Sequence, residues 1–114
     1  QEEEPRISSV EMDFLVRLKR IINANLQNPD LNSDFISQKI FLSRSQVNRK
    51  VKSLTGMDTA TFIRTARLSM AREMLRQTSL PVSDIAIKCG FEHQSYFNKL
   101  FKQEFGVTPS EARK

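Results

Sequence analysis

The sequence has little of several residue types on which whole classes of protein depend. Its 114 residues include one cysteine, one histidine, three glycines and no tryptophan. A single cysteine cannot form an internal disulfide, which excludes a disulfide-stabilised scaffold and fits a reducing compartment. One cysteine and one histidine also argue against a structural zinc site. Three glycines and four prolines are too few for the tight turns of a β-sandwich.

Longer features are missing as well. No stretch approaches about 18 consecutive apolar residues, and no signal-peptide pattern opens the chain, so we expect neither a membrane span nor a leader. The sequence has no glycine-rich phosphate loop, no second histidine and no nucleophile beside an evident base, so we expect no catalytic residue, metal or cofactor. Because the chain begins with Gln1 rather than Met, we expect a piece of a longer protein.

The formal net charge of +5 is unevenly distributed. Residues 1–30 carry six acidic and four basic side chains, whereas residues 31–114 carry fourteen basic and seven acidic ones. A basic body behind an acidic lead-in favours a polyanionic partner, of which nucleic acid is the commonest. The charge alone is equally compatible with a helical domain that has an ordinary charged surface.

Apolar residues recur with helical period along almost the whole chain, and capping residues mark where helices begin. The spacing of a capping box occurs at Ser8 with Glu11, Ser43 with Gln46, and Thr108 with Glu111. Asp58 or Thr59 caps a long helix over residues 59–77, and Pro81 prevents its continuation. We therefore expect an all-α fold of seven helices, preceded by an acidic linker over residues 1–7.

The strongest signal is an internal repeat with a spacing of fifty residues. Seven identities relate the copies: Ser33 and Ser83, Asp34 and Asp84, Phe41 and Phe91, Ser45 and Ser95, Asn48 and Asn98, Lys52 and Lys102, Gly56 and Gly106. Two copies are too few for a solenoid, so the repeat indicates a duplicated supersecondary unit. Each copy reads as a short helix, a turn and a second helix with one apolar face, which is the helix-turn-helix pattern. We expect Phe41 and Phe91 to lie in the core.

This pattern divides residues 8–114 into a first helix-turn-helix unit at 8–57, a connecting helix at 58–78 and a second unit at 79–114. At about 1.5 Å per residue, a helix over residues 59–77 spans roughly 28 Å. Successive major-groove segments on one face of DNA lie about 34 Å apart. The connecting helix therefore favours a monomeric unit whose two second helices read neighbouring groove segments.

Polar side chains recur at matched positions of the second helix in both copies. The candidate base-contacting residues are Ser45, Asn48 and Arg49 in the first copy and Gln94, Ser95, Asn98 and Lys99 in the second. Asn and Gln bind adenine through two hydrogen bonds, and Arg or Lys binds guanine, so these residue types suit the reading of base edges. Two alternatives stay open: solvated faces of two packed helices, and a helical protein-interaction module that docks an acidic partner without reading DNA sequence.

A set of motif residues in the connecting helix and the second copy carries a family resemblance. They are Arg67-Leu68, Ala71, Leu75, Ile85-Ala86, Gly90-Phe91, Ser95-Tyr96-Phe97, Phe101-Lys102, Gly106 and Thr108-Pro109-Ser110. With them, residues 33–113 resemble the DNA-binding domain of the AraC/XylS family of bacterial transcription regulators. The resemblance implies a homeodomain-like fold and base contacts from the candidates above, although the second unit of many members contacts mainly the DNA backbone. It also implies phosphate contacts from Arg44, Lys52 and Lys102.

Four other residues have a less specific interpretation. His93 stands where an N-cap Asp, Ser or Asn is usual in the family, and a protonated imidazole there could contact phosphate. Tyr96 could donate a hydrogen bond to a phosphate. Arg67 either braces the connecting helix or contacts backbone phosphate. We expect Cys89 to be a small buried hydrophobic residue rather than a redox sensor.

The first copy indicates a wider protein around this domain. Its motifs, Ser43-Arg44-Ser45-Gln46, Arg49-Lys50 and Leu54-Thr55-Gly56, are similar to members fused behind sensor kinases and receiver domains in hybrid two-component regulators. The resemblance implies an upstream sensor or receiver domain in the same polypeptide, where any fused kinase would lie. It further implies double-stranded DNA as a partner, RNA polymerase as a candidate partner, a bacterial cytoplasmic location and no membrane contact by this domain.

Overall fold

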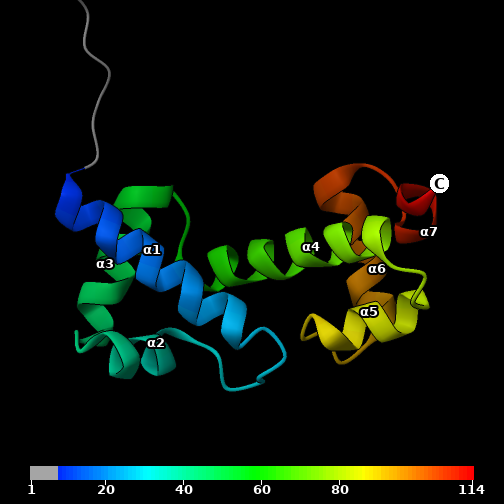
Figure 1. The fold of residues 1–114 in the computed structure, drawn as a ribbon. Helices are drawn as coiled ribbons and strands as arrows, with labels where there is room; N and C mark the ends of the chain where they lie inside the picture. The colour runs from blue at the N-terminus through cyan, green and yellow to red at the C-terminus, as the bar shows by residue number, and fades with distance from the viewer. Residues whose placement is uncertain (1–7) are drawn as a thin grey trace, which may run out of the picture.

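The fold is helical throughout the part of the chain that can be described. A computed structural model describes residues 8–114, which form seven helices and no strand (Figure 1). The helices are α1 (Ser9–Ala24), α2 (Ser33–Ile40), α3 (Arg44–Thr55), α4 (Thr59–Gln77), α5 (Val82–Lys88), α6 (Gln94–Phe105) and α7 (Pro109–Arg113). The predicted all-α fold is confirmed. The predicted linker over residues 1–7 lies outside the described residues.

Side-chain caps determine where most of the helices begin. All three predicted capping boxes are present. In the first, the Ser8 hydroxyl accepts a hydrogen bond from the Glu11 amide at 3.1 Å, and the Glu11 carboxylate accepts one from the Ser8 amide at 3.0 Å. Asp58 rather than Thr59 caps α4, because its carboxylate accepts from the Thr61 amide at 2.8 Å. These bonds satisfy amides that the first turn of a helix leaves unpaired.

Two hydrophobic cores, one at each end of α4, divide the fold into two lobes (Figure 1). The first core brings together α1, α2 and α3 around Leu18 and Ile36, and the second brings together α5 and α6 around Phe97. α4 joins the two lobes, because Ile63 near its start packs in the first core and Leu75 near its end packs in the second. Two helix-turn-helix units joined by a long helix are therefore the observed architecture.

The two units match in structure with a change of register that the fifty-residue shift does not predict. α3 and α6 keep the predicted spacing, since Val47 and Phe97 occupy equivalent, fully buried positions. The first helices are offset by forty-nine residues instead, because buried Ile36 of α2 corresponds to buried Ile85 of α5. Counted between these equivalent buried positions, Ile36 to Val47 and Ile85 to Phe97, the second unit is therefore one residue longer than the first.

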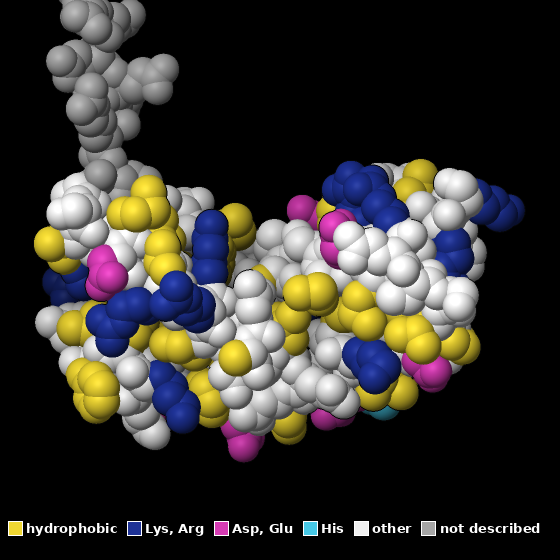
Figure 2. Space-filling model, in the orientation of Figure 1, with side chains coloured by type: hydrophobic (Ala, Val, Ile, Leu, Met, Phe, Trp, Pro, Cys, Tyr) yellow, Lys and Arg dark blue, Asp and Glu magenta, His cyan; other side chains and the backbone are white. Residues whose placement is uncertain are grey.

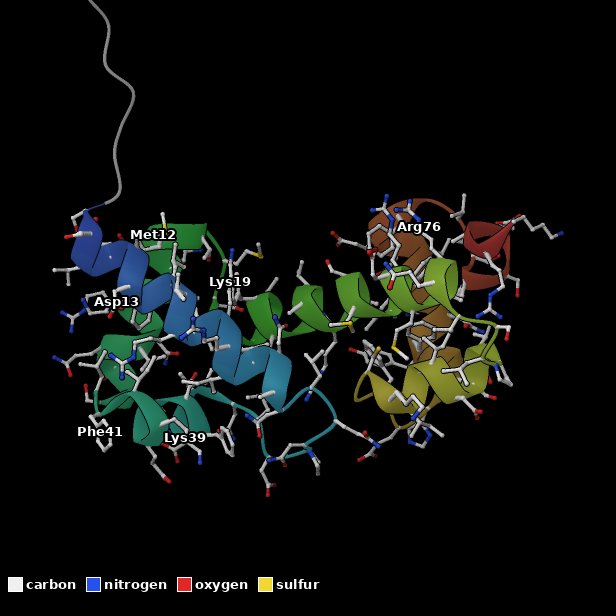
Figure 3. The ribbon with its side chains drawn as sticks, in the orientation of Figure 1. Met12, Asp13, Lys19, Lys39, Phe41 and Arg76 are labelled. Atoms are coloured by element: carbon white, nitrogen blue, oxygen red, sulfur yellow. The ribbon has the colours of Figure 1, made fainter. Side chains whose placement is uncertain are left out.

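The prediction that Phe41 lies in the core is wrong. Its side chain is 87% exposed, whereas Phe91 is 7% exposed and packs against Phe97 with ring centroids 5.1 Å apart. Figure 3 shows Phe41 projecting from the turn between α2 and α3. With the offset of forty-nine residues, the first-unit counterpart of Phe91 is Leu42, and the counterpart of Gly90 is Phe41.

Candidate nucleic-acid interface

α3 turns an apolar face to the first core and a polar face to solvent. Val47 and Val51 are fully buried. The exposed predicted residues of this helix are Arg44, Ser45, Asn48, Arg49 and Lys52. Residues three and four apart share one side of a helix, so Ser45, Asn48 and Arg49 form one surface. The structure thus brings together the set that the sequence predicts for the first unit.

Asn48 has hydrogen-bond partners within the fold that the sequence did not indicate. Its Oδ1 accepts hydrogen bonds from the Ser33 hydroxyl at 2.6 Å and from the Thr59 hydroxyl at 2.8 Å. Asn48 therefore ties α3 to the start of α2 and the start of α4. Because its carbonyl oxygen is engaged, Asn48 has only its amide nitrogen left to donate to a base. It can therefore make one hydrogen bond to an acceptor such as adenine N7, rather than the two-bond contact with adenine that a free Asn side chain makes.

α6 repeats this arrangement with larger side chains in its core face. Phe97 and Phe101 are fully buried, and their ring centroids lie 5.7 Å apart. The exposed predicted residues are His93, Gln94, Ser95, Tyr96, Lys99 and Lys102. Tyr96 is 52% exposed. These side chains surround the start and outer side of α6, as a recognition helix requires.

Asn98 departs from its counterpart Asn48. It is half-buried, and its Oδ1 is enclosed without a hydrogen-bond partner. In the first unit the equivalent oxygen is satisfied by a hydroxyl on α4, Thr59, whereas the residue fifty positions later is Pro109, which offers no hydroxyl. Asn98 is therefore the least accessible of the predicted base-contacting residues.

The N-termini of the two candidate recognition helices also differ. α3 is closed by its capping box, in which Ser43 and Gln46 exchange hydrogen bonds of 2.9 and 3.1 Å. α6 begins after His93, whose side chain makes no capping hydrogen bond. The first-turn amides of α6 consequently lack the side-chain acceptor that those of α3 have, and an approaching phosphate oxygen can supply it.

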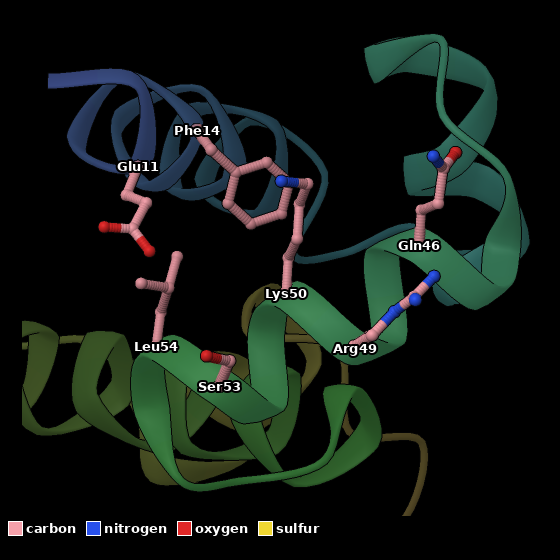
Figure 4. A pocket seen from close by; sticks show the side chains of 7 residues that line it. All are labelled: Glu11, Phe14, Gln46, Arg49, Lys50, Ser53 and Leu54. Carbon is pink, nitrogen blue, oxygen red and sulfur yellow. The ribbon is translucent and has the colours of Figure 1, made fainter. Parts of the chain in front are cut away.

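A cleft of about 390 Å³ separates α1 from α3 (Figure 4). Its lining residues are Glu11, Phe14, Gln46, Arg49, Lys50, Ser53 and Leu54. Lys50 reaches toward α1, and its Nζ lies 5.8 Å from the centroid of the Phe14 ring, within the range of a cation–π contact. In Figure 4 Arg49 extends away from α1. Lys50 therefore supports the packing of α1, whereas Arg49 is exposed to solvent.

Basic side chains occur at both ends of the molecule. On the face shown in Figure 2, Lys and Arg side chains lie over both lobes, and the strip between them is largely uncharged. Lys52, at the end of α3, donates to the carbonyl of Gly56 at 3.2 Å, so part of its role is to close the helix. The charges are thus spread over two separate units rather than gathered in one patch.

Three further properties of the described residues concern metal binding, membrane crossing and the single thiol. No group of three or more His, Cys, Asp or Glu side chains within residues 8–114 is arranged to hold a metal ion. None of the helices in this range is long and apolar enough to cross a membrane. Cys89 is fully buried as predicted, and burial raises the pKa of its thiol to about 11, although the charge of Arg67 opposes the rise.

Comparisons with known proteins agree with this geometry. A family model described as a helix-turn-helix domain matches residues 36–114. A solved transcriptional regulator from Chromobacterium violaceum, described as containing an AraC-type DNA-binding domain, is 29% identical and has a TM-score of 0.85 over 93% of this chain and 94% of that one. The chain is an AraC-type helix-turn-helix domain. The resemblance seen in the motif residues is therefore confirmed.

Two curated relatives match this chain over a part of their own length. Histidine kinase P4 from Formosa agariphila is 31% identical over 105 residues, which are 92% of this chain and 8% of that protein. The HTH-type transcriptional activator RhaS from Escherichia coli is 33% identical over 84 residues, which are 74% of this chain and 30% of that protein. This chain thus spans less than a third of the length of either relative.

Proposed function

We propose that this chain binds double-stranded DNA sequence-specifically in transcription regulation, with α3 and α6 inserting into adjacent segments of the major groove. The observation that carries the proposal is the pair of exposed polar faces on α3 and α6, at opposite ends of α4. Both faces consist of residue types that bind base edges, and neither contributes to the cores. The 19-residue α4 spans roughly 28 Å, which suits neighbouring groove segments about 34 Å apart.

The residues divide into those that read bases and those that hold the backbone. Base contacts come from Ser45, Asn48 and Arg49 on α3 and from Gln94, Ser95, Asn98 and Lys99 on α6. Phosphate contacts come from Arg44, Lys52, His93, Tyr96 and Lys102. Because Asn48 donates through one nitrogen only, Arg49 carries the largest share of readout in the first unit. In the second unit the half-buried Asn98 contributes less than the exposed Gln94, Ser95 and Lys99.

The domain acts, in this proposal, as the output part of a longer two-component signalling protein in the bacterial cytoplasm. Support comes from the curated relative that is a histidine kinase, of which the matching region is 8%. A sensor or receiver domain upstream in the same polypeptide would supply the signal. RNA polymerase is a further candidate partner.

The proposal is tested by selecting preferred sites from random duplex DNA with residues 8–114 and measuring affinity against ionic strength. We expect one enriched sequence. We also expect the logarithm of the affinity to fall linearly with the logarithm of the salt concentration, with a slope of about −0.9 for each phosphate that the protein neutralises. Arg49→Ala should weaken binding to the selected site by about 5- to 150-fold and relax preference at one base pair. Arg76→Ala, an exposed arginine in the last turn of α4, is the matched control and should have little effect.

Failure of any duplex library to enrich a sequence would overturn sequence-specific binding. A helical protein-interaction module, the alternative function, predicts that outcome together with tight binding to an acidic protein. An unchanged affinity of the Arg49→Ala variant for an enriched site would instead show that α3 is not the recognition helix of the first unit.

A further inference from the structure

Segments from different parts of the fold meet at Arg67, near the middle of α4. Its Nε donates a hydrogen bond to the carbonyl of Leu26 at 3.0 Å, and its Nη2 donates one to the carbonyl of Asn28 at 3.1 Å. Both carbonyls belong to the loop between α1 and α2. Of the two roles that the sequence allowed for Arg67, bracing is the one observed, and the braced element is this loop of the first unit.

The turn of the second unit reaches the same place through Gly90. A Cβ added to Gly90 would collide with the carbonyl oxygen of Leu26 and would lie 2.6 Å from Nε of Arg67. Gly90 also has a φ of 93°, in the left-handed region that favours glycine. The backbone of the α5–α6 turn therefore packs directly against the α1–α2 loop and against the guanidinium that holds it.

This junction closes a ring between the two lobes. Among the described residues, the two hydrophobic cores have no member in common, and α4 is the element that contributes to both. Units that share no large hydrophobic interface move relative to one another by default, so α4 alone would leave the relative orientation of the lobes adjustable. The contact among Gly90, Arg67 and the α1–α2 loop adds a second connection beside α4, at a distance from its axis.

We propose that Arg67 and Gly90 form an interlock that fixes the distance and angle between α3 and α6, and with them the spacing of the two DNA half-sites. This inference rests on the proposed function. Arg67 and Gly90 are positioning residues, since they act through the placement of the recognition helices. The interlock discriminates between sites that contain the same bases at different separations.

The chemistry of the junction provides closely matched variants. Lysine at position 67 keeps the charge but has one nitrogen in place of the planar guanidinium, so Arg67→Lys cannot make both hydrogen bonds in the same geometry. Gly90→Ala adds a methyl group at the point of contact. Gly106 has a φ of 81° with nothing within 4 Å of an added Cβ, so Gly106→Ala introduces the same backbone strain without the collision. Arg76→Ala removes an arginine of α4 elsewhere.

The first experiment compares a selected site with the same site carrying one extra base pair between its halves. The insertion displaces the second half by about 3.4 Å and rotates it by about 35°. We expect the inserted base pair to lower the affinity of the wild-type protein at least about tenfold. This fold-change corresponds to the loss of about one hydrogen bond to a charged group. Arg67→Lys and Gly90→Ala should lose less than about threefold. Gly106→Ala and Arg76→Ala should discriminate as the wild type does.

The second experiment needs no DNA, so it separates the interlock from the proposed function. Spin labels are placed on Ser53→Cys of α3 and Gln103→Cys of α6, two exposed equivalent positions, while buried Cys89 resists labelling. Double electron–electron resonance should give one narrow distance distribution in the parent and in Gly106→Ala. Arg67→Lys and Gly90→Ala, checked by circular dichroism to be folded, should give a broader one.

The outcomes of the two experiments separate two failures. If no site is selected, the proposed function fails, and the label distances still decide whether the interlock exists. If Arg67→Lys and Gly90→Ala keep both the narrow distribution and the tenfold discrimination, the interlock is overturned while DNA binding stands. A variant that broadens the distances without relaxing the spacing preference also overturns the proposal, because spacing would then be set elsewhere.

Discussion

Phe41 and Gly90 occupy the same position in the two helix-turn-helix units, the left-handed residue that follows the first helix. Their φ angles are 65° and 93°. In both units the next amide donates to a carbonyl five residues earlier, which closes the helix in the same way. A left-handed backbone costs an L residue about 1–2 kcal/mol, a cost that glycine avoids. Within residues 8–114, Phe41 is the one residue other than glycine with a positive φ.

Replacing Phe41 with glycine should therefore stabilise the domain. Because the ring is 87% exposed, its removal forfeits little burial. Relief of backbone strain outweighs the extra entropy of glycine in the unfolded chain, so we expect the free energy of unfolding to rise by about 0.5–1 kcal/mol. Phe41→Ala, which removes the ring and keeps the strain, should change it by less than about 0.5 kcal/mol. Urea denaturation measures both, and a less stable glycine variant would contradict the expectation.

The helix boundaries could be predicted from the sequence because their determinants are local. The capping box of Ser43 with Gln46 and the glycine after α3 lie within a turn of the ends that they define. The register of α2 against α5 could not be predicted in the same way. The identities of Asp34 with Asp84 and Phe41 with Phe91 pointed to a fifty-residue offset, but burial of Ile36 and Ile85 imposes forty-nine.

The candidate interface could be predicted from the sequence only as far as exposure. The helical period separated Val47 and Val51 from the polar face of α3, because which side of an amphipathic helix is buried depends on its pattern alone. The partners of Asn48 and Arg67 lie far away in the sequence, at separations of 11 to 41 residues. Only the packed fold brings these groups together, so their bracing roles left no local signal.

Asn48 combines a structural and a recognition role, and two substitutions should separate them. Asn48→Ala removes the acceptor for Ser33 and Thr59, and the Thr59 side chain is only 3% exposed. We expect a loss of about 1–3 kcal/mol in the free energy of unfolding together with weaker DNA binding. Asn48→Asp keeps an acceptor oxygen but replaces the amide donor with a negative charge. It should retain most of the stability while lowering affinity for the selected site more than tenfold, about 1.4 kcal/mol.

Asn98→Ala provides the matched comparison in the second unit. The Oδ1 of Asn98 is enclosed without a partner, so its removal should cost less stability than Asn48→Ala, and the difference should be at least about 1 kcal/mol. Chemical denaturation of the two alanine variants gives the comparison directly. Equal losses at both positions would mean that the hydrogen bonds of Asn48 do not stabilise the first unit.

Acid should weaken the domain through its helix caps. Hydrogen bonds from the backbone and then the side chain of Thr61 hold the pKa of Asp58 below its usual value, and Ser8 does the same for Glu11. A carboxyl whose pKa is lower in the folded state binds its proton more tightly in the unfolded state. The stability that it contributes is present above the unfolded pKa of about 4 and is lost as the pH falls through the folded pKa.

Asp58→Asn tests this linkage, because asparagine caps helices well but does not titrate. The advantage of the wild type over Asp58→Asn in free energy of unfolding should be constant near neutrality and should shrink below about pH 4. Thermal or urea denaturation between about pH 7 and about pH 2.5 measures it. Glu111→Gln, in the capping box of α7, should give a difference of the same sign. A difference that does not vary with pH would contradict a titrating cap.

The thiol of Cys89 should be protected by the fold. It is fully buried against Met74, with the sulfur atoms 3.7 Å apart, and burial raises its pKa to about 11. At about pH 8 a far smaller fraction of this thiol is therefore ionised in the folded state than in the unfolded chain. Because the thiolate is the reactive species, an aromatic disulfide reagent should label the native domain at least about 100-fold more slowly than the urea-unfolded chain.

The same reagent should label a folded Ser53→Cys variant rapidly, since that position is exposed. Labelling of native Cys89 as fast as that of Ser53→Cys would show that the second core opens readily and that this thiol is available for redox chemistry.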